Sequence, residues 1–168
     1  MRALEGIRVI DLTRVVAGPY CTFQLALMGA DCIKIEHPDG GDPVRYSGAG
    51  SNTYFRERGM ATNFLPQNAG KRSITLNLKS DAGREVFLRL ARDADVVVEN
   101  FRSGVMDSLG IGYEALRALN PRIVFCSLTG YGQTGPRGKH TAYDGVIQAA
   151  SGMMSVIGTP QTGPDRKS

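Results

Sequence analysis

The sequence predicts an α/β fold, in the form of a doubly wound, mainly parallel sheet with helices on both faces. Short apolar runs rich in β-branched residues recur along the chain, and segments with apolar residues at helical spacing separate them. Strands that alternate with helices favour a parallel sheet, because each parallel connection needs a crossover that is usually a helix. With 168 residues, of which 42% are hydrophobic, the chain is long enough for one sizeable core, and we treat residues 1–168 as one domain.

A first βαβ unit lies near the N-terminus. Residues 8–12 and 32–36 are short β-rich runs, and residues 20–28 between them have apolar side chains at helical spacing, with Gly29 suited to the C-terminal cap. The segment that follows, residues 39–71, is polar, Gly-rich and aperiodic. It exceeds the roughly 12–15 residues of an ordinary long loop, so we expect it to be functional or to be ordered by a partner.

A second βαβ unit comes after this segment. Residues 72–78 alternate as a strand, Ser80 or Asp81 caps the next helix, and residues 95–99 form a buried strand. The apolar side chains of that helix share one face: Val86, Phe87, Leu90 and Ala91.

Further helices and a strand complete the pattern. The helices are expected at residues 104–109, 113–119 and 143–151, and the strand at residues 122–128. Ligands of such sheets bind at the carboxyl ends of the strands. The segments expected there are residues 13–19, 36–42, 77–79, 100–104 and 129–139.

Composition and charge exclude several classes of protein. The 20 basic residues are scattered singly and mostly neighbour acids, and no basic stretch is interleaved with aromatic residues, so we expect no nucleic-acid partner. An anionic small ligand fits the net charge of +4 better. No apolar run approaches the roughly 18–20 residues of a membrane span, and the first residues lack the apolar region of a signal peptide. We therefore expect a cytoplasmic protein without a membrane partner.

Cysteines and histidines give no sign of a metal site. Cys21, Cys32 and Cys126 lie in apolar segments without a C-x-x-C pair, which favours reduced structural thiols. His37 and His140 have no clustered ligands beside them, so we expect no metal.

A glycine-rich motif, GYGQTG at residues 130–135, follows the last predicted strand. It matches the dinucleotide pattern G-x-G-x-x-G, but that site needs a helix opening on the third glycine, and residues 136–140 prolong the loop instead. A mobile loop over an active site and a structural turn are the other interpretations. The first β-α turn also lacks the dinucleotide glycines, although Glu36 stands where such a protein keeps its ribose-binding acid.

Two further groups of residues have a functional and a structural interpretation. Lys71, Arg72 and Lys79 flank one strand and either neutralise phosphates or form a solvated edge. Asn100 and Phe101 end a buried strand, where they either recognise a planar group or serve as a capping amide and a core aromatic.

Several sequence blocks together resemble one family of enzymes. In order, they are LEGIRVID (4–11), AGP (17–19), GADCIKIE (29–36), NAGKRSI (68–74), VENF (98–101) and GYGQTGP (130–136). These blocks resemble the class III CoA-transferase family, also called the carnitine dehydratase/bile-acid-inducible type, which includes formyl-CoA transferase and α-methylacyl-CoA racemase.

The resemblance implies a Rossmann-like large domain with coenzyme A bound, as an acyl-CoA substrate, at the strand ends. It also implies an interlocked homodimer. The positions that match CoA-contacting residues are Val15, Val16, Ala17, His37, Leu76, Asn77, Leu78, Lys79, Asn100 and Phe101. At position 37 formyl-CoA transferase has an arginine near the phosphates, and Ser108 stands at another position that is often basic.

The resemblance also implies a covalent mechanism. The family's catalytic aspartate attacks the acyl-CoA and then carries CoA as an aspartyl-CoA thioester, which an acceptor carboxylic acid resolves. That aspartate matches a position beyond Ser168. The chain is thus expected to be the N-terminal CoA-binding portion of a longer protein, and to be inactive by itself.

Tyr143 and Asp144 bear on the type of reaction. Racemases of the family have an acid/base histidine where this chain has Tyr143, and a phenol with a pKa near 10 is a poor proton shuttle at neutral pH. The pair resembles the tyrosine-acid pair of the transferases, so we expect it to support CoA transfer. Two alternatives stay open: an α-methylacyl-CoA racemase, and a non-catalytic nucleotide-binding domain that uses residues 130–135.

Overall fold

The computed structural model describes residues 2–48 and 52–166. The chain forms two compact units, Met1–Leu128 and Thr129–Ser168, and each is described by itself.

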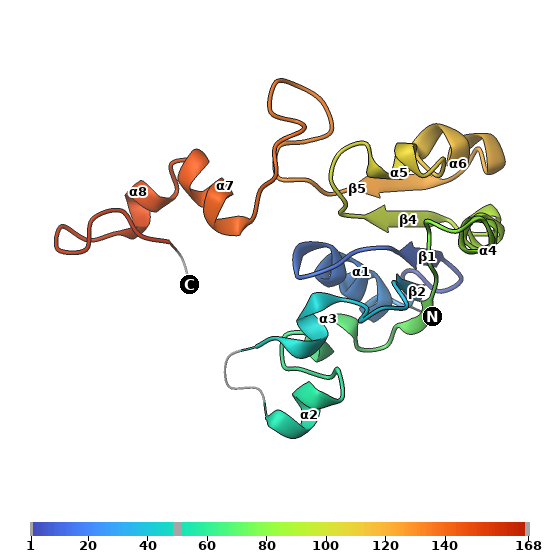
Figure 1. The fold of residues 1–168 in the computed structure, drawn as a ribbon, viewed down its shortest axis with the longest axis horizontal. Helices are drawn as coiled ribbons and strands as arrows, with labels where there is room; N and C mark the ends of the chain where they lie inside the picture. Colours follow the sequence, from blue (N-terminus) through green and yellow to red (C-terminus); the bar gives the residue numbers. More distant parts are fainter. Residues whose placement is uncertain (1, 49–51, 167–168) are drawn as a thin grey trace. The chain divides into compact units, whose positions relative to one another are not determined.

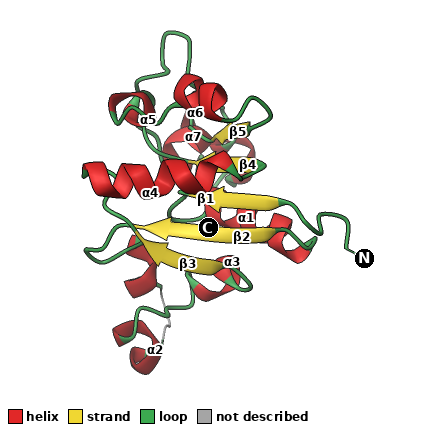
Figure 2. Ribbon diagram, turned by 90° about the vertical axis from the view of Figure 1, so that its right-hand side faces the viewer, coloured by secondary structure: helices red, strands yellow, loops and turns green. Residues whose placement is uncertain are grey.

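The described part of the first unit contains a five-stranded, all-parallel sheet, which confirms the predicted fold class. The strand order is β3-β2-β1-β4-β5 (Figure 2), and its β2-β1-β4-β5 part can also be followed in Figure 1. In the register of the central strands, Ile10 lies opposite Ile33 on one side and Val97 on the other. The strands are β1 (Arg8–Asp11), β2 (Asp31–Glu36), β3 (Arg72–Thr75), β4 (Val96–Glu99) and β5 (Val124–Ser127).

Helices cover both faces of this sheet, as predicted. The helices in the described part of the first unit are α1 (Ala17–Leu27), the 3₁₀ helix η1 (Pro43–Tyr46), α2 (Thr53–Glu57), α3 (Leu65–Asn68), α4 (Asp81–Arg92), α5 (Val105–Ser108) and α6 (Tyr113–Leu119). The second unit contains α7 (Asp144–Ala150) and α8 (Met154–Ile157).

The core has two layers because successive strand residues point to opposite faces. On the face covered by α4 and α6, Ile10, Val97 and Phe87 are fully buried. On the face covered by α1, Val9 and Cys32 are buried instead, and they pack with partly buried residues of α1. The second face also contains buried charged residues: Asp11, Lys34 and Glu36.

Helix α1 begins at Ala17, three residues before the predicted start. Pro19 does not interrupt it, because the first turn of a helix has no backbone acceptor for its N–H groups and tolerates a proline. The strand predicted at residues 72–78 is shorter and ends at Thr75. Asn77 turns the chain there, since its side chain accepts from the Lys79 backbone N–H at 3.0 Å and its carbonyl accepts from that of Ser80.

The segment predicted to be an aperiodic loop contains three short helical turns, η1, α2 and α3. Two of them begin at a capping side chain: Asp42 accepts from the Val44 N–H, and Asn52 accepts from the Tyr54 N–H. Turns of four or five residues are too short to produce a visible hydrophobic period, so the sequence pattern does not reveal them.

Among the described residues, no helix is long and apolar enough to cross a membrane. No group of three or more His, Cys, Asp or Glu side chains within the same residues could hold a metal ion.

Candidate functional site

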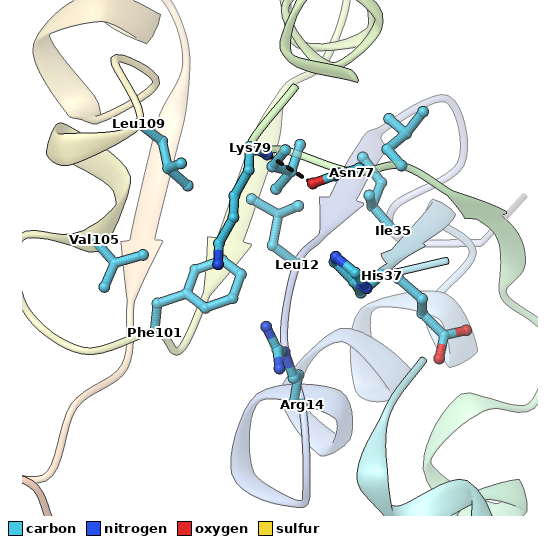
Figure 3. Close-up of a pocket in the computed structure, with 12 residues that line it drawn as sticks. Leu12, Arg14, Ile35, His37, Asn77, Lys79, Phe101, Val105 and Leu109 are labelled. Carbon is cyan, nitrogen blue, oxygen red and sulfur yellow. Dashed lines mark hydrogen bonds between the residues drawn. The ribbon is translucent and has the colours of Figure 1, made fainter. Parts of the chain in front are cut away.

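A cavity of about 120 Å³ lies at the carboxyl ends of the strands in the first unit (Figure 3). The ends of β1, β2 and β4 and the turn after β3 all contribute to it, as the strand-end argument predicts. Its lining residues are Leu12, Arg14, Ile35, Glu36, His37, Leu76, Asn77, Leu78, Lys79, Phe101, Val105 and Leu109.

Apolar walls and basic side chains share this cavity. Aliphatic side chains and the Phe101 ring form most of its lining, and Arg14, His37 and Lys79 reach it from three different strand ends (Figure 3). Arg14 and Lys79 are exposed and His37 is half-buried. A flat, largely apolar group that carries negative charge is complementary to such a lining.

The turn between β1 and α1 supplies Arg14, and its backbone is fixed by Asn100. The Arg14 N–H donates to the Asn100 carboxamide oxygen at 2.8 Å, and the Asn100 amide donates to the Arg14 carbonyl at 2.7 Å. The guanidinium carbon of Arg14 lies 5.2 Å from the centre of the Phe101 ring, within the range of a cation–π contact.

Glu99, the last residue of β4, holds the backbone of Phe101 in the turn that follows the strand. Its carboxylate accepts from the Phe101 backbone N–H at 2.7 Å and from the Ser127 hydroxyl. Burial raises the pKa of Glu99, and these hydrogen bonds oppose that effect. The side chain thus positions Phe101 at the cavity.

Glu36 lines the cavity, but its carboxylate is occupied by other partners. Arg45 donates to both of its oxygens, at 2.8 and 2.5 Å, and Ser73 and the Asp42 N–H donate at 3.0 and 2.9 Å. Burial alone would raise the pKa of Glu36, but the hydrogen bonds and the Arg45 charge outweigh it and lower the pKa to about 2. Glu36 is therefore an ionised anchor for the 39–71 segment and not a ribose-binding acid.

The structure gathers part of the predicted CoA-contacting set in this cavity. His37, Leu76, Asn77, Leu78, Lys79 and Phe101 line it. The lining does not include Val15, Val16, Ala17 or Asn100; these lie in or against the β1–α1 turn, and their contact with CoA stays a prediction. Arg14 also lines the cavity, and its place within the strand-end segment 13–19 is the sequence signal that points to it.

The two basic residues at the start of β3 differ in their surroundings, and only Arg72 fits the interpretation of a solvated edge. The Lys71 side chain is 1% exposed and pairs with Asp11 at 2.9 Å, whereas the Arg72 side chain is 63% exposed and pairs with Asp31 at the amino end of β2. Neither side chain is available to a phosphate at the carboxyl ends, so Lys79 is the member of this group that reaches the cavity.

Tyr143 and Asp144 belong to the second unit. Tyr143 precedes α7 and is 78% exposed, and Asp144 accepts from the Gln148 side chain at 2.5 Å. In the glycine motif the chain turns after Gly135, where the Gly138 N–H donates to the Gly135 carbonyl, and no helix opens there in the described segment 136–143. The glycine motif therefore lacks the helix that a pyrophosphate site requires.

Residues 4–168 match the family model of CoA-transferase family III. The chain belongs to this family. Curated CoA-transferase relatives include succinate–glutarate CoA-transferase of Agrobacterium fabrum, 46% identical over 96% of this chain, and acetyl-CoA:oxalate CoA-transferase of Acetobacter aceti, also 46% identical over 96%. The chain spans about 40% of the length of these relatives.

Solved structures agree with the family III assignment. A CAIB/BAIF family protein from Brucella suis has a TM-score of 0.91 and 40% identity, covering 99% of this chain and 43% of that one. A protein from Mycobacterium tuberculosis has a TM-score of 0.86 and 39% identity, covering 98% of this chain and 44% of that one.

Proposed function

We propose that the whole protein is a CoA-transferase that moves CoA between carboxylic acids, and that the cavity of this chain binds the nucleotide end of CoA. The observation that carries the proposal is the basic, largely apolar cavity at the carboxyl edge of a family III sheet. Its volume of about 120 Å³ suits one ring system of a ligand rather than a whole acyl-CoA, whose remainder would extend into solvent or over other parts of the protein.

In this proposal different parts of the cavity bind different parts of CoA. The adenine ring lies between the aliphatic walls and the Phe101 ring, and the phosphates lie at the rim near Arg14, His37 and Lys79. Arg14 is the residue expected to contribute most to phosphate binding, because a guanidinium is always charged at neutral pH. It supplies permanent positive charge beside His37, which stands where formyl-CoA transferase has an arginine.

We infer the covalent route from the same family. An aspartate carboxylate attacks the thioester carbonyl and expels the CoA thiolate, which leaves a mixed anhydride. The thiolate then attacks the aspartyl carbonyl of the anhydride, which forms the aspartyl-CoA thioester and releases the donor acid. The acceptor carboxylate expels the thiolate again to form a second anhydride, and attack of the thiolate on its acceptor carbonyl gives the new acyl-CoA and regenerates the aspartate.

Tyr143 and Asp144 are proposed to support these steps. The first acids to test are dicarboxylates, because several relatives are named for them.

The same proposal includes an interlocked homodimer that works in the cytoplasm. Light scattering of the whole protein measures its oligomeric state, and a stable monomer would contradict the proposed dimer.

The test is calorimetric titration of the whole protein with CoA and with NAD, together with an Arg14→Ala variant. We expect binding of CoA but not of NAD, and a CoA Kd raised about 5- to 30-fold by Arg14→Ala, since a charge-assisted hydrogen bond at an exposed site contributes about 1–2 kcal/mol. Arg117→Ala is the matched control, because Arg117 is an exposed cation in the last turn of α6, outside the cavity.

Three results would overturn the proposal. They are binding of NAD without CoA, an equal effect of the two arginine variants, and epimerisation of α-methyl acyl-CoAs without any exchange of CoA between acids.

A further inference from the structure

A buried ion pair lies on the face of the sheet that α1 covers. Lys34, in the middle of β2, and Asp42, just before η1, are separated by 3.3 Å, and their side chains are 1% and 0% exposed. Neither residue lines the cavity. Burying two charges is costly, and a buried pair is often no more stabilising than apolar side chains of similar volume. Stability alone therefore does not explain why Lys34 and Asp42 are buried together, and their hydrogen bonds to neighbouring backbone groups indicate a further role.

The pair holds the β1–α1 turn at two points. The Lys34 ammonium donates to the Thr13 carbonyl at 2.8 Å, and the Val15 N–H donates to the Asp42 carboxylate, 3.2 Å from each oxygen. Thr13 and Val15 are the neighbours of Arg14 on either side. One ion pair thus fixes the backbone before and after the residue that carries the guanidinium to the cavity.

The conformation of this turn requires such support. Val15 has a φ of 70°, and it is the non-glycine residue with a positive φ in the described backbone. A β-branched side chain is strained in this region. Further support comes from Asn100 on Arg14 and from Gln67, whose amide nitrogen lies 3.1 and 3.2 Å from the carbonyl oxygens of Val15 and Val16 in the orientation that satisfies both.

We propose that Lys34 and Asp42 are positioning residues for ligand binding: they hold the β1–α1 turn in its strained conformation and so direct Arg14 toward the cavity. This inference rests on the proposed function, because the ligand that Arg14 meets there is taken to be CoA. It assigns to a buried pair an effect on affinity that its own side chains, shielded from the cavity, could not exert directly.

The main test is the neutral double variant Lys34→Met with Asp42→Asn in the whole protein. This variant leaves no unpaired charge in the interior, so we expect it to fold, with a lower unfolding midpoint because the buried Thr13 carbonyl loses its donor. It loses the hydrogen bond to the Thr13 carbonyl and weakens the hydrogen bond from the Val15 N–H. We expect faster hydrogen exchange at the Val15 amide and a CoA Kd raised about tenfold or more.

A rescue and a control separate positioning from a structural role. Adding Val15→Gly to the double variant removes the steric strain, since glycine adopts positive φ freely, and should recover part of the lost affinity. Asp95→Asn is the control: its carboxylate also accepts a backbone N–H, from Arg8 at 2.8 Å, but at the amino end of β1. We expect Asp95→Asn to lower the unfolding midpoint without changing the CoA Kd.

The outcomes distinguish this inference from the proposed function. If the wild type binds CoA and the double variant binds it equally well with unchanged exchange at Val15, the positioning role is wrong and the proposed function stands. If the wild type itself does not bind CoA, the proposed function fails, and the positioning role in CoA binding fails with it.

Discussion

Replacing Glu36 with glutamine removes the negative charge from a carboxylate that is 4% exposed and receives four hydrogen bonds. The folded state lowers its pKa from the ordinary 4.5 to about 2, because the hydrogen bonds from Arg45, Ser73 and the Asp42 N–H outweigh the effect of burial. At about 1.4 kcal/mol per pKa unit, this difference corresponds to about 3 kcal/mol of stability at neutral pH.

The sign of the pH dependence follows from the direction of this change. A carboxyl whose pKa is lower in the folded protein binds protons more readily when unfolded, so its contribution is present above pH 4.5 and is lost as the pH falls toward 2. The Glu36→Gln variant lacks this contribution at every pH. The wild type should therefore be about 3 kcal/mol more stable than the variant at pH 7, and the gap should narrow below pH 4.5.

Urea unfolding followed by far-ultraviolet circular dichroism at pH 7, 4.5 and 3 measures both quantities. Glu114→Gln is the matched control, because Glu114 is an exposed acid in the first turn of α6, and its removal should cost at most about 0.5 kcal/mol. A gap below about 1 kcal/mol at pH 7, or one that stays constant as the pH falls, would refute the reasoning.

Two further predictions concern the N-cap of α4 and a buried thiol. Ser80 accepts from the Gly83 N–H at 3.1 Å as the N-cap of α4, so Ser80→Ala should lower the free energy of unfolding by about 1 kcal/mol, and an unchanged urea midpoint would contradict the capping role. Burial raises the pKa of the Cys32 thiol to about 11, so iodoacetamide at pH 8 should leave Cys32 unmodified in the folded protein and alkylate it after unfolding. Peptide mass spectrometry measures this, and rapid labelling of the native thiol would contradict its burial.

The strands of this fold could be predicted because their signal is local. Strands buried on both faces of a parallel sheet are nearly continuous apolar runs, and β1, β2, β4 and β5 lie where such runs occur. The ends of elements were less accurate. A capping side chain such as Asp42 or a turn such as the one at Asn77 depends on one residue and leaves no periodic pattern.

The sequence also predicted the edge of the sheet where the cavity lies, since parallel strands bring their carboxyl ends together regardless of side-chain detail. It did not predict that Arg14 would reach the cavity while Lys71 would be buried against Asp11. Both are cations next to predicted strands, and residue type alone cannot distinguish them.

By itself, then, the sequence determined the alternation of strands and helices, the family and the edge that holds the candidate site. Only the tertiary structure decided which cations face the cavity and which are paired inside, that Lys34 and Asp42 meet, and that Val15 takes a left-handed conformation between them. The physical reason is the distance along the chain over which each effect acts. Hydrophobic period and propensity act over a few neighbouring residues, whereas an ion pair or a strained turn is stabilised by groups that are brought together only when the strands and the segments between them have packed.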